Sequence, residues 1–329
     1  MKRSSCFFTV IPLMAFLATP DLLLYNATRD GALVNICLHV VDSTGNPVPH
    51  ARLRGGLQTG AGFNDFSSIE GITNTNGDYI VHGKCTRRVR CGITKKGYYP
   101  SEFFISYPVK DIKPQVIDGK WQPFGEERDV VLKEIRAPGK LCTFPDTLRS
   151  CRIPEFDKWL GFDLELCDWC EPYGRGAHKD VLLKFDATRN QLHDYCYVMD
   201  VSFTNNPYAG AYKLMKDKSS RLMTEYAADS NATYQATFSF VSEQVQGEPR
   251  HWDFLDADSY LVFRTRTSVD ADGHLKGAHY GKILGRWLSD AEFMILSDGC
   301  FNPVENDVGI EDSTTLRNAL RNLDKELVQ

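Results

Sequence analysis

The sequence predicts an all-β protein: an N-terminal immunoglobulin-like sandwich, followed by a second antiparallel β-rich domain. Short segments rich in β-branched and aromatic residues recur along the chain, and Gly, Pro, Asn and Asp separate them. Aromatic residues make up 12% of the chain, which suits strands that pack one face into a core. With 329 residues, each half is long enough to bury a core of its own.

The first segment has the pattern of an export signal. A basic start at residues 1–3 precedes an apolar run over residues 5–17 that is short for a membrane-spanning helix. The sequence therefore predicts a signal peptide over residues 1–20 and a linker over residues 21–33. It indicates a secreted, periplasmic or cell-envelope protein, with an uncleaved anchor or a buried N-terminal strand as the alternatives. No transmembrane segment is predicted beyond this run.

Residues 34–135 are predicted to form the first sandwich. The Asn76-Gly77 pair suits a tight hairpin turn, because both residues tolerate positive φ. Glycines within residues 55–62 indicate a loop. The strands expected in this domain are 35–41, 47–57, 79–81, 87–94, 103–107 and 128–135.

Three short motifs follow one another along this domain. They are Asp42-x-x-Gly45-x-Pro47-Val48, Thr73-x-Thr75-x-Gly77-x-Tyr79 and Lys95-x-Gly97-Tyr98. Their order resembles the carboxypeptidase regulatory-like domain, and the resemblance covers residues 34–135. It implies a seven-stranded transthyretin-like sandwich and no activity, because the motifs are turn and core positions. The chain departs from the family pattern at three cysteines, Cys37, Cys85 and Cys91.

Residues 139–310 are predicted to form the second β-rich domain, with a cysteine-containing loop at its start. Residues 156–166 are expected to carry one helical turn, and residues 270–273 a hairpin turn. Residues 311–329 are predicted to be a C-terminal helix or tail. The strands expected in this domain are 180–185, 195–203, 233–241, 259–267 and 279–287.

A second set of motifs lies in this domain. It consists of Gly161-x-Asp163-Leu164-Glu165, Asp168-Trp169-x-x-Pro172-Tyr173-Gly174-x-Gly176 and Tyr280-Gly-Lys-Ile-x-Gly285. This set is similar to the C-terminal part of uncharacterised exported bacterial proteins that carry a regulatory-like domain in front. The resemblance implies architecture and location, and no activity.

The cysteines suggest disulfide bonds in an oxidising compartment, although spacing alone gives no connectivity. The pair Cys167 and Cys170 forms a Cys-x-x-Cys, so a metal site or a redox dithiol is an alternative there. A zinc site would need further ligands at matching spacing, which the sequence does not supply. The disulfide candidates are Cys85, Cys91, Cys142, Cys151, Cys167 and Cys170.

No catalytic residue and no cofactor is predicted. The eight histidines form none of the zinc-peptidase motifs, and nucleophile elbows and phosphate loops are absent. His274 and His279 lie near Asp270 and Asp272, which leaves a surface metal site open. Solvated turn residues are the favoured interpretation of this group.

These observations favour a non-catalytic binding or scaffolding protein whose partner is a protein or a carbohydrate. The net charge of −5 argues against a nucleic-acid partner. Five tryptophans could stack on sugar rings, although core packing is the favoured interpretation. A hydrolase that acts on polysaccharide or peptide through residues 139–310 is the alternative function.

Overall fold

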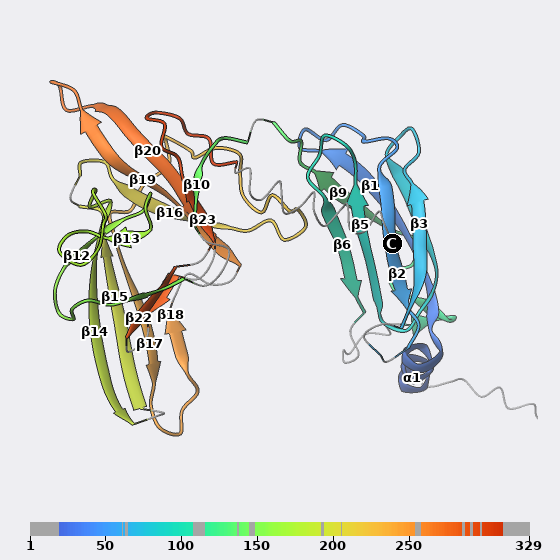
Figure 1. The fold of residues 1–329 in the computed structure, drawn as a ribbon. Helices are drawn as coiled ribbons and strands as arrows, with labels where there is room; N and C mark the ends of the chain where they lie inside the picture. Colours follow the sequence, from blue (N-terminus) through green and yellow to red (C-terminus); the bar gives the residue numbers. More distant parts are fainter. Residues whose placement is uncertain are drawn as a thin grey trace, which may run out of the picture. The chain divides into compact units, whose positions relative to one another are not determined.

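The computed structural model confirms the all-β prediction (Figure 1). Its described residues contain one helix and are otherwise dominated by strands. They fall into two compact units: unit 1 (Met1–Lys95 and Glu102–Val131) and unit 2 (Lys96–Ser101 and Leu132–Gln329). The structure describes residues 20–60, 62, 65–107, 116–136, 138–144, 149–191, 194–204, 206–253, 258–284, 287–289, 292–296 and 298–311.

Two of the predicted segments fall almost wholly outside the described residues. These are the signal peptide over residues 1–20 and the C-terminal helix or tail over residues 311–329. In the part of the chain that is described, no helix is long and apolar enough to cross a membrane.

The described strands of unit 1 form two sheets. One sheet has the order β4-β1-β8-β7, with β9 also paired to β1, and the other has the order β3-β2-β5-β6. Because β7 and β8 have two residues each, seven longer strands remain among the described strands. The strands of unit 1 are β1 (Ala32–Asp42), β2 (Arg52–Gln58), β3 (Phe66–Ile72), β4 (Asp78–Cys85), β5 (Arg88–Thr94), β6 (Ser101–Ser106), β7 (Val116–Ile117), β8 (Lys120–Trp121) and β9 (Glu126–Leu132).

Side-chain alternation in β1 decides which face of its sheet enters the core of unit 1. Val34, Ile36 and Leu38 are fully buried, whereas Cys37 and His39 between and after them are half-buried. Successive side chains of a strand point to opposite faces, so Cys37 and His39 lie together on the outer face.

The expected linker over residues 21–33 is wrong, because the chain forms helix α1 (Pro20–Asp30) there. Proline is well suited to the first turn of a helix, where its missing N–H costs nothing. The helix ends at Gly31, whose φ is 81° and whose N–H donates to the carbonyl of Ala27 at 3.0 Å. Glycine adopts this left-handed conformation without strain, so it is a normal stop for a helix.

Two expected turns of unit 1 are also corrected. Gly55 and Gly56 belong to strand β2 instead of a loop, and they pair with both β3 and β5. Gly77 does form a turn, with a φ of 80°, but β3 and β4 belong to different sheets. The turn therefore carries the chain from one sheet to the other instead of closing a hairpin.

The described strands of unit 2 form three antiparallel sheets. Their orders are β13-β12-β14-β15-β17-β18, β10-β23-β20-β19-β16 and β11-β22-β21. The strands are β10 (Cys142–Thr143), β11 (Arg149–Arg152), β12 (Leu160–Asp163), β13 (Asp168–Trp169), β14 (Val181–Gln191), β15 (Asp194–Ser202), β16 (Gly210–Met215), β17 (Thr237–Gln244), β18 (His251–Asp253), β19 (Ser259–Val269), β20 (Leu275–Ile283), β21 (Trp287–Ser289), β22 (Phe293–Leu296) and β23 (Gly299–Phe301).

One apolar cluster joins the three sheets of unit 2. It takes Phe185 from β14, Phe263 from β19 and Trp287 from β21, and all three side chains are buried. The hairpin expected at residues 270–273 is confirmed, since it connects β19 to β20 and Gly273 has a φ of 84°. The helical turn expected over residues 156–166 is wrong, because β12 occupies Leu160–Asp163 and pairs with β14.

Candidate functional site

A pocket of about 730 Å³ lies in unit 2. Its size falls in the range of roughly 300–1,000 Å³ that small-molecule sites occupy. The wall combines aromatic rings, two carboxylates and one guanidinium. The lining residues are Cys151, Arg152, Ile153, Pro154, Phe156, Cys167, Asp168, Trp169, Tyr173 and Glu292.

Trp169 forms a fixed part of this wall. Its indole N–H donates to the carbonyl of Arg152 at 2.9 Å, and its ring meets Phe162 and Phe185 edge to face, with centroids 5.1 and 5.9 Å apart. The residue is 5% exposed, so most of its surface serves the core. A Trp held by both a hydrogen bond and ring contacts gives the pocket a rigid base.

The loop that carries the pocket residues is held by one buried carboxylate, Asp163. Its Oδ1 accepts from the N–H groups of Glu165 and Leu166, each at 3.0 Å. Its Oδ2 accepts from the N–H groups of Ala177 and His178, at 2.9 and 3.0 Å. Four backbone donors on a single carboxylate draw the two ends of the loop together.

Glycine is required where this loop is most compact. A Cβ at Gly176 would lie 2.8 Å from the Cβ of Asp163 and 2.9 Å from the carbonyl of Trp169, and a Cβ at Gly174 would also collide with that carbonyl. The sequence motif that spans residues 161–176 is therefore explained by loop packing. It shapes one side of the pocket and supplies Asp168, Trp169 and Tyr173 to its wall.

Asp168 and Tyr173 are the polar groups of the loop that face the pocket. Asp168 accepts from its neighbour Trp169 N–H at 2.9 Å and from Arg175 N–H at 3.3 Å. Tyr173 is 40% exposed, and its hydroxyl is hydrogen-bonded to Glu155. This hydrogen bond to a carboxylate raises the pKa of Tyr173, so the hydroxyl remains protonated at neutral pH.

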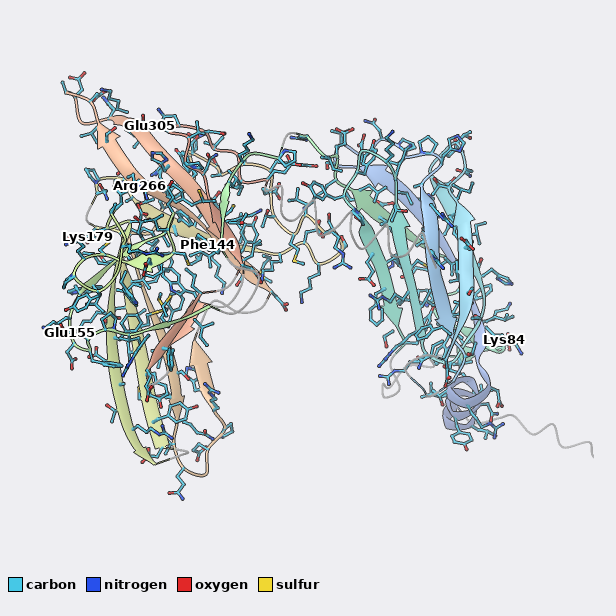
Figure 2. All side chains as sticks on the ribbon, viewed as in Figure 1. Lys84, Phe144, Glu155, Lys179, Arg266 and Glu305 are labelled. Carbon is cyan, nitrogen blue, oxygen red and sulfur yellow. The ribbon has the colours of Figure 1, made fainter. Side chains whose placement is uncertain are left out.

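Behind the loop, Arg266 of β19, which is labelled in Figure 2, forms a largely buried ion network. Its guanidinium lies 2.8 Å from Asp180, 2.5 Å from Glu165 and 3.3 Å from Asp163. Its φ is 47°, at an irregularity in the pairing of β19 with β20. Its guanidinium also stacks 4.5 Å from the ring centroid of Phe301.

Burial and pairing compete in this network. Burial raises the pKa of Asp180, and the hydrogen bonds from Arg266 oppose that rise. Burial alone would lower the pKa of Arg266, but the hydrogen bonds to Asp180 and Glu165 and the nearby negative charges together outweigh burial, so the pKa of Arg266 is raised. One arginine therefore stabilises the two buried carboxylates, Asp163 and Asp180, and also pairs with the partly exposed carboxylate of Glu165.

Two carboxyl groups are in contact next to the pocket wall, one of them directly after Phe156 in the sequence. Asp157 and Asp186 share a hydrogen bond, and Lys184 lies 3.0 Å from Asp186. The hydrogen bond to Asp186, together with its negative charge, raises the pKa of Asp157, whereas the pKa of Asp186 is lowered. Carboxylates in direct contact leave no room between them for the water or sugar of glycoside hydrolysis.

The cysteines predicted to form disulfides are thiols in the structure, as are the other described cysteines. Burial raises the pKa of Cys85 and of Cys91 to about 12, and burial also raises the pKa of Cys170 to about 11. Cys151 and Cys167 line the pocket, whereas Cys142 pairs with Phe301 in another sheet. The disulfide assignments for these cysteines stay predictions.

In the described part of the chain, no third metal ligand joins Cys167 and Cys170. Within the described ranges, neither belongs to a group of three His, Cys, Asp or Glu side chains that could share an ion. The thiol of Cys170 donates to the carbonyl of His178 at 3.3 Å, and Cys167 has a φ of 54°. Both residues therefore shape the loop that forms the pocket wall.

Two other groups of three metal-ligating side chains occur among the described residues. Asp270, Asp272 and His274 lie together at the exposed tip of the β19–β20 hairpin, as the sequence suggested. His279 is not part of that group, because its Nδ1 lies 3.1 Å from the carbonyl of Asn302. The other group consists of Cys37 and His39 on β1 and Asp78 on β4 of unit 1. The sequence did not indicate it, because its members come together only through the pairing of the two strands.

The tryptophans mostly confirm the preference for core packing. Trp121, Trp169 and Trp287 are buried, and Trp159 is 51% exposed. Asp168, Trp169 and Tyr173 belong to a sequence motif, but nothing in the sequence places them in a pocket, because the rest of the wall comes from distant segments. Glu292 lies in no motif, and its position depends on the pairing of β22 with β11.

No family model and no curated protein sequence matches this chain. Among solved structures, 3-chlorocatechol 1,2-dioxygenase from Rhodococcus opacus 1CP is 11% identical with a TM-score of 0.27, over 32% of this chain and 62% of the dioxygenase. Catechol 1,2-dioxygenase from Pseudomonas arvilla C-1 is 15% identical with a TM-score of 0.21, over 33% and 54% of the two chains.

The dioxygenase matches thus span 54% to 62% of the lengths of those enzymes. A candidate carbohydrate binding protein from Bacteroides uniformis ATCC 8492 is 8% identical with a TM-score of 0.16, over 83% of this chain and 98% of that chain. At these TM-scores, none of the three structures assigns a function to the present chain.

Proposed function

We propose that the chain is a non-catalytic binding protein that holds a neutral oligosaccharide in the unit 2 pocket. The observation that carries this proposal is the composition of the pocket wall, which includes the half-exposed ring of Tyr173 and the carboxylates of Asp168 and Glu292. Sugar rings offer an apolar C–H face to an aromatic ring, and their hydroxyls donate to carboxylates. Arg152 adds a charged donor on the same wall.

The rigidity of the wall supports binding. Trp169 is fixed by its hydrogen bond to Arg152, and the loop that carries Asp168 is closed by the four hydrogen bonds to Asp163. A preformed site loses less conformational entropy on binding, which increases affinity for a ligand that makes few contacts.

A glycan array probed with the full chain tests this function. We expect binding to at least one neutral oligosaccharide, weakened roughly tenfold or more by Tyr173→Ala and by Asp168→Asn, since a charged hydrogen bond contributes about 1.5–3 kcal/mol. Phe104→Ala is the matched control, because Phe104 is 58% exposed and belongs to unit 1. Binding that survives both pocket substitutions, or the absence of binding to any glycan, would contradict the proposal.

We also propose that the protein works outside the cytoplasm and that unit 1 is a carboxypeptidase regulatory-like domain. The basic start and apolar run of residues 1–17 support export, and the motif order of residues 34–135 supports the domain assignment. Intact mass spectrometry of the protein from the envelope and secreted fractions is the direct test. A mature chain that still carries residues 1–17 in the cytoplasmic fraction alone would contradict export.

The two pocket carboxylates favour a hydrolase as the second candidate function. Asp168 and Glu292 both line the cavity, and hydrolysis of a glycosidic bond uses a pair of carboxylates. The release of reducing ends from the oligosaccharide that binds best distinguishes the two functions. Turnover that is lost in Glu292→Gln would establish the hydrolase, whereas binding without turnover supports the non-catalytic role.

A further inference from the structure

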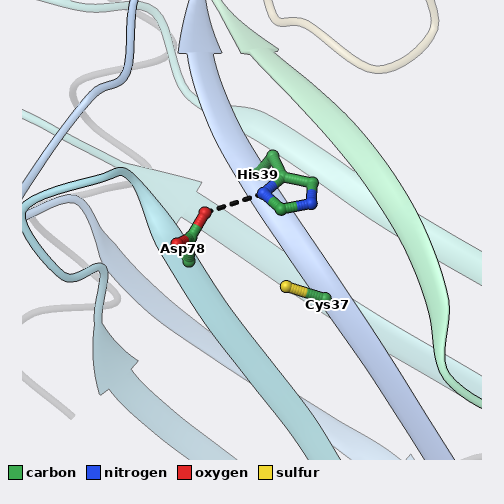
Figure 3. A group of neighbouring side chains, drawn as sticks. All are labelled: Cys37, His39 and Asp78. Atoms are coloured by element: carbon green, nitrogen blue, oxygen red, sulfur yellow. Dashed lines mark hydrogen bonds and ion pairs between the residues drawn. The ribbon is translucent and has the colours of Figure 1, made fainter.

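Unit 1 carries a side-chain cluster that has no part in the pocket of unit 2. Cys37 and His39 alternate on β1 and share its outer face, and Asp78 is the residue of β4 directly opposite His39. Figure 3 shows the three side chains next to one another, with two on one strand and one on its neighbour. Strand pairing thus brings a thiol, an imidazole and a carboxylate together from positions far apart in sequence.

The distances within this cluster suit a single cation. One potential ligand atom from each residue, the Cys37 Sγ, a ring nitrogen of His39 and a carboxylate oxygen of Asp78, lies within 4.8 Å of the others. The Nδ1 of His39 is 2.7 Å from Oδ1 of Asp78. In a tetrahedral site with metal–ligand bonds of about 2.0–2.3 Å, ligand atoms are roughly 3.4 Å apart, so small side-chain rotations would complete the geometry.

The other nitrogen of His39 also has a partner. Its Nε2 lies 3.9 Å from a carboxylate oxygen of Glu127 on β9. Metal-binding histidines commonly donate their second N–H to a carboxylate, which orients the ring and increases its basicity. Asp129, on the same strand, adds a third negative charge in the electrostatic environment of His39.

The charge of this face favours a cation. Asp78, Glu127 and Asp129 contribute three negative charges around one imidazole and one thiol. The side chains of His39 and Asp78 are 33% and 27% exposed, so an ion could enter from solvent while remaining partly shielded. Thiolate, imidazole and carboxylate together are a donor set that zinc accepts and that magnesium and calcium do not prefer.

We propose that Cys37, His39 and Asp78 bind one divalent transition-metal ion, with Zn²⁺ as the preferred ion. The ligands are Cys37 Sγ, His39 Nδ1 and a carboxylate oxygen of Asp78, and the carboxylate of Glu127, 3.9 Å from Nε2 of His39, adds a negative charge beside the ring. When the ion binds, the proton of neutral His39 moves from Nδ1 to Nε2, and the thiol proton of Cys37 passes to solvent. Three protein ligands leave the fourth position of a tetrahedral ion to water.

The test titrates the full, reduced chain with Co²⁺, followed by competition with Zn²⁺. We expect about one ion per chain and a near-ultraviolet thiolate-to-cobalt band that Zn²⁺ removes. Cys37→Ser should abolish the band, and His39→Asn and Asp78→Asn should each weaken binding roughly tenfold or more. Because the three side chains are half-exposed, circular dichroism should show that the variants fold like the parent chain.

His274→Asn is the matched control, because His274 belongs to the other group of three metal-ligating side chains. It should leave the affinity and the band unchanged. The proposal is overturned if the full chain gives no saturable band, if the band persists in Cys37→Ser, or if His274→Asn weakens binding as much as His39→Asn does. In these last two cases the ion binds elsewhere, and the His39–Asp78 contact is an ordinary surface ion pair.

Discussion

At the scale of single residues, unit 2 depends on the pairing of its buried charges. Arg266 is 16% exposed and neutralises carboxylates that are themselves almost completely buried, among them Asp163 and Asp180. Arg266 belongs to none of the motifs in the sequence, so its role could not be predicted. The role depends on an irregularity in the pairing of β19, at which the guanidinium of Arg266 lies in the interior behind the pocket loop.

Arg266→Met should lower the free energy of unfolding of unit 2 by about 3–5 kcal/mol at pH 7.5, because it leaves unpaired charges in the interior. Burial already raises the pKa of Asp180, and without the guanidinium this pKa should rise further. The folded variant then binds more protons than the unfolded chain, so its stability falls as pH rises through the pKa of folded Asp180.

The loss measured by urea denaturation should therefore be smaller at pH 4.5 than at pH 7.5. Arg266→Lys keeps a positive charge but cannot form the forked contacts, and it should lie between the parent chain and Arg266→Met. An equal loss at both pH values would show that Asp180 does not respond to Arg266.

Asp157→Asn should leave the thermal stability of the protein unchanged or raise it at pH 7. The hydrogen bond to Asp186, together with the negative charge of Asp186, raises the pKa of Asp157, so ionised Asp157 is unfavourable in the folded state. A raised folded-state pKa stabilises the fold at low pH, and this stabilisation is lost as pH rises through that pKa. Asparagine also tolerates the φ of 58° at this position. If the melting temperature of Asp157→Asn were lower than that of the parent chain at pH 7 but not at pH 4, ionised Asp157 would be stabilising, contrary to this expectation.

At the scale of strands and turns, alternating apolar residues and turn residues were sufficient to predict an element wherever the local sequence alone determines it. The alternating apolar residues of β1 and the Asp270–Gly273 turn between β19 and β20 follow the prediction. Residues 156–166 did not, because their pairing with β14 outweighs the local helical preference. The Cys37–His39–Asp78 cluster was likewise out of reach, since only the register of β1 and β4 brings it together.

Gly55 shows why a glycine-rich segment became a strand. A Cβ at Gly55 would lie 2.6 Å from the Cα of Cys91 and would collide with the carbonyl of Arg90, so only glycine allows β2 and β5 to approach this closely. Gly55→Ala should destabilise unit 1 by at least about 2 kcal/mol.

Gly92 of β5 provides the control for Gly55. Its added Cβ would be 3.7 Å from the nearest atom, the carbonyl oxygen of Arg54, and its backbone is not left-handed. Gly92→Ala should leave stability unchanged or raise it by roughly 0.5 kcal/mol, since alanine loses less entropy on folding. Similar melting temperatures for the two variants would contradict the close approach of β2 and β5.

At the scale of the whole molecule, the chain contains two compact units, and the largest apolar cluster of unit 2 takes all its residues from that unit. We therefore expect calorimetry to resolve two unfolding transitions. Gly55→Ala should lower one of them and Arg266→Met the other, because the two residues belong to different units. A single transition that both variants lower equally would show that the units unfold as one.

Saccharide binding in the unit 2 pocket can be observed in a crystal structure of the full chain soaked with the oligosaccharide that gives the strongest array signal. We expect a sugar ring against Tyr173 with hydroxyls hydrogen-bonded to Asp168 and Glu292. Sugar density on another surface, with this pocket holding water alone, would contradict it.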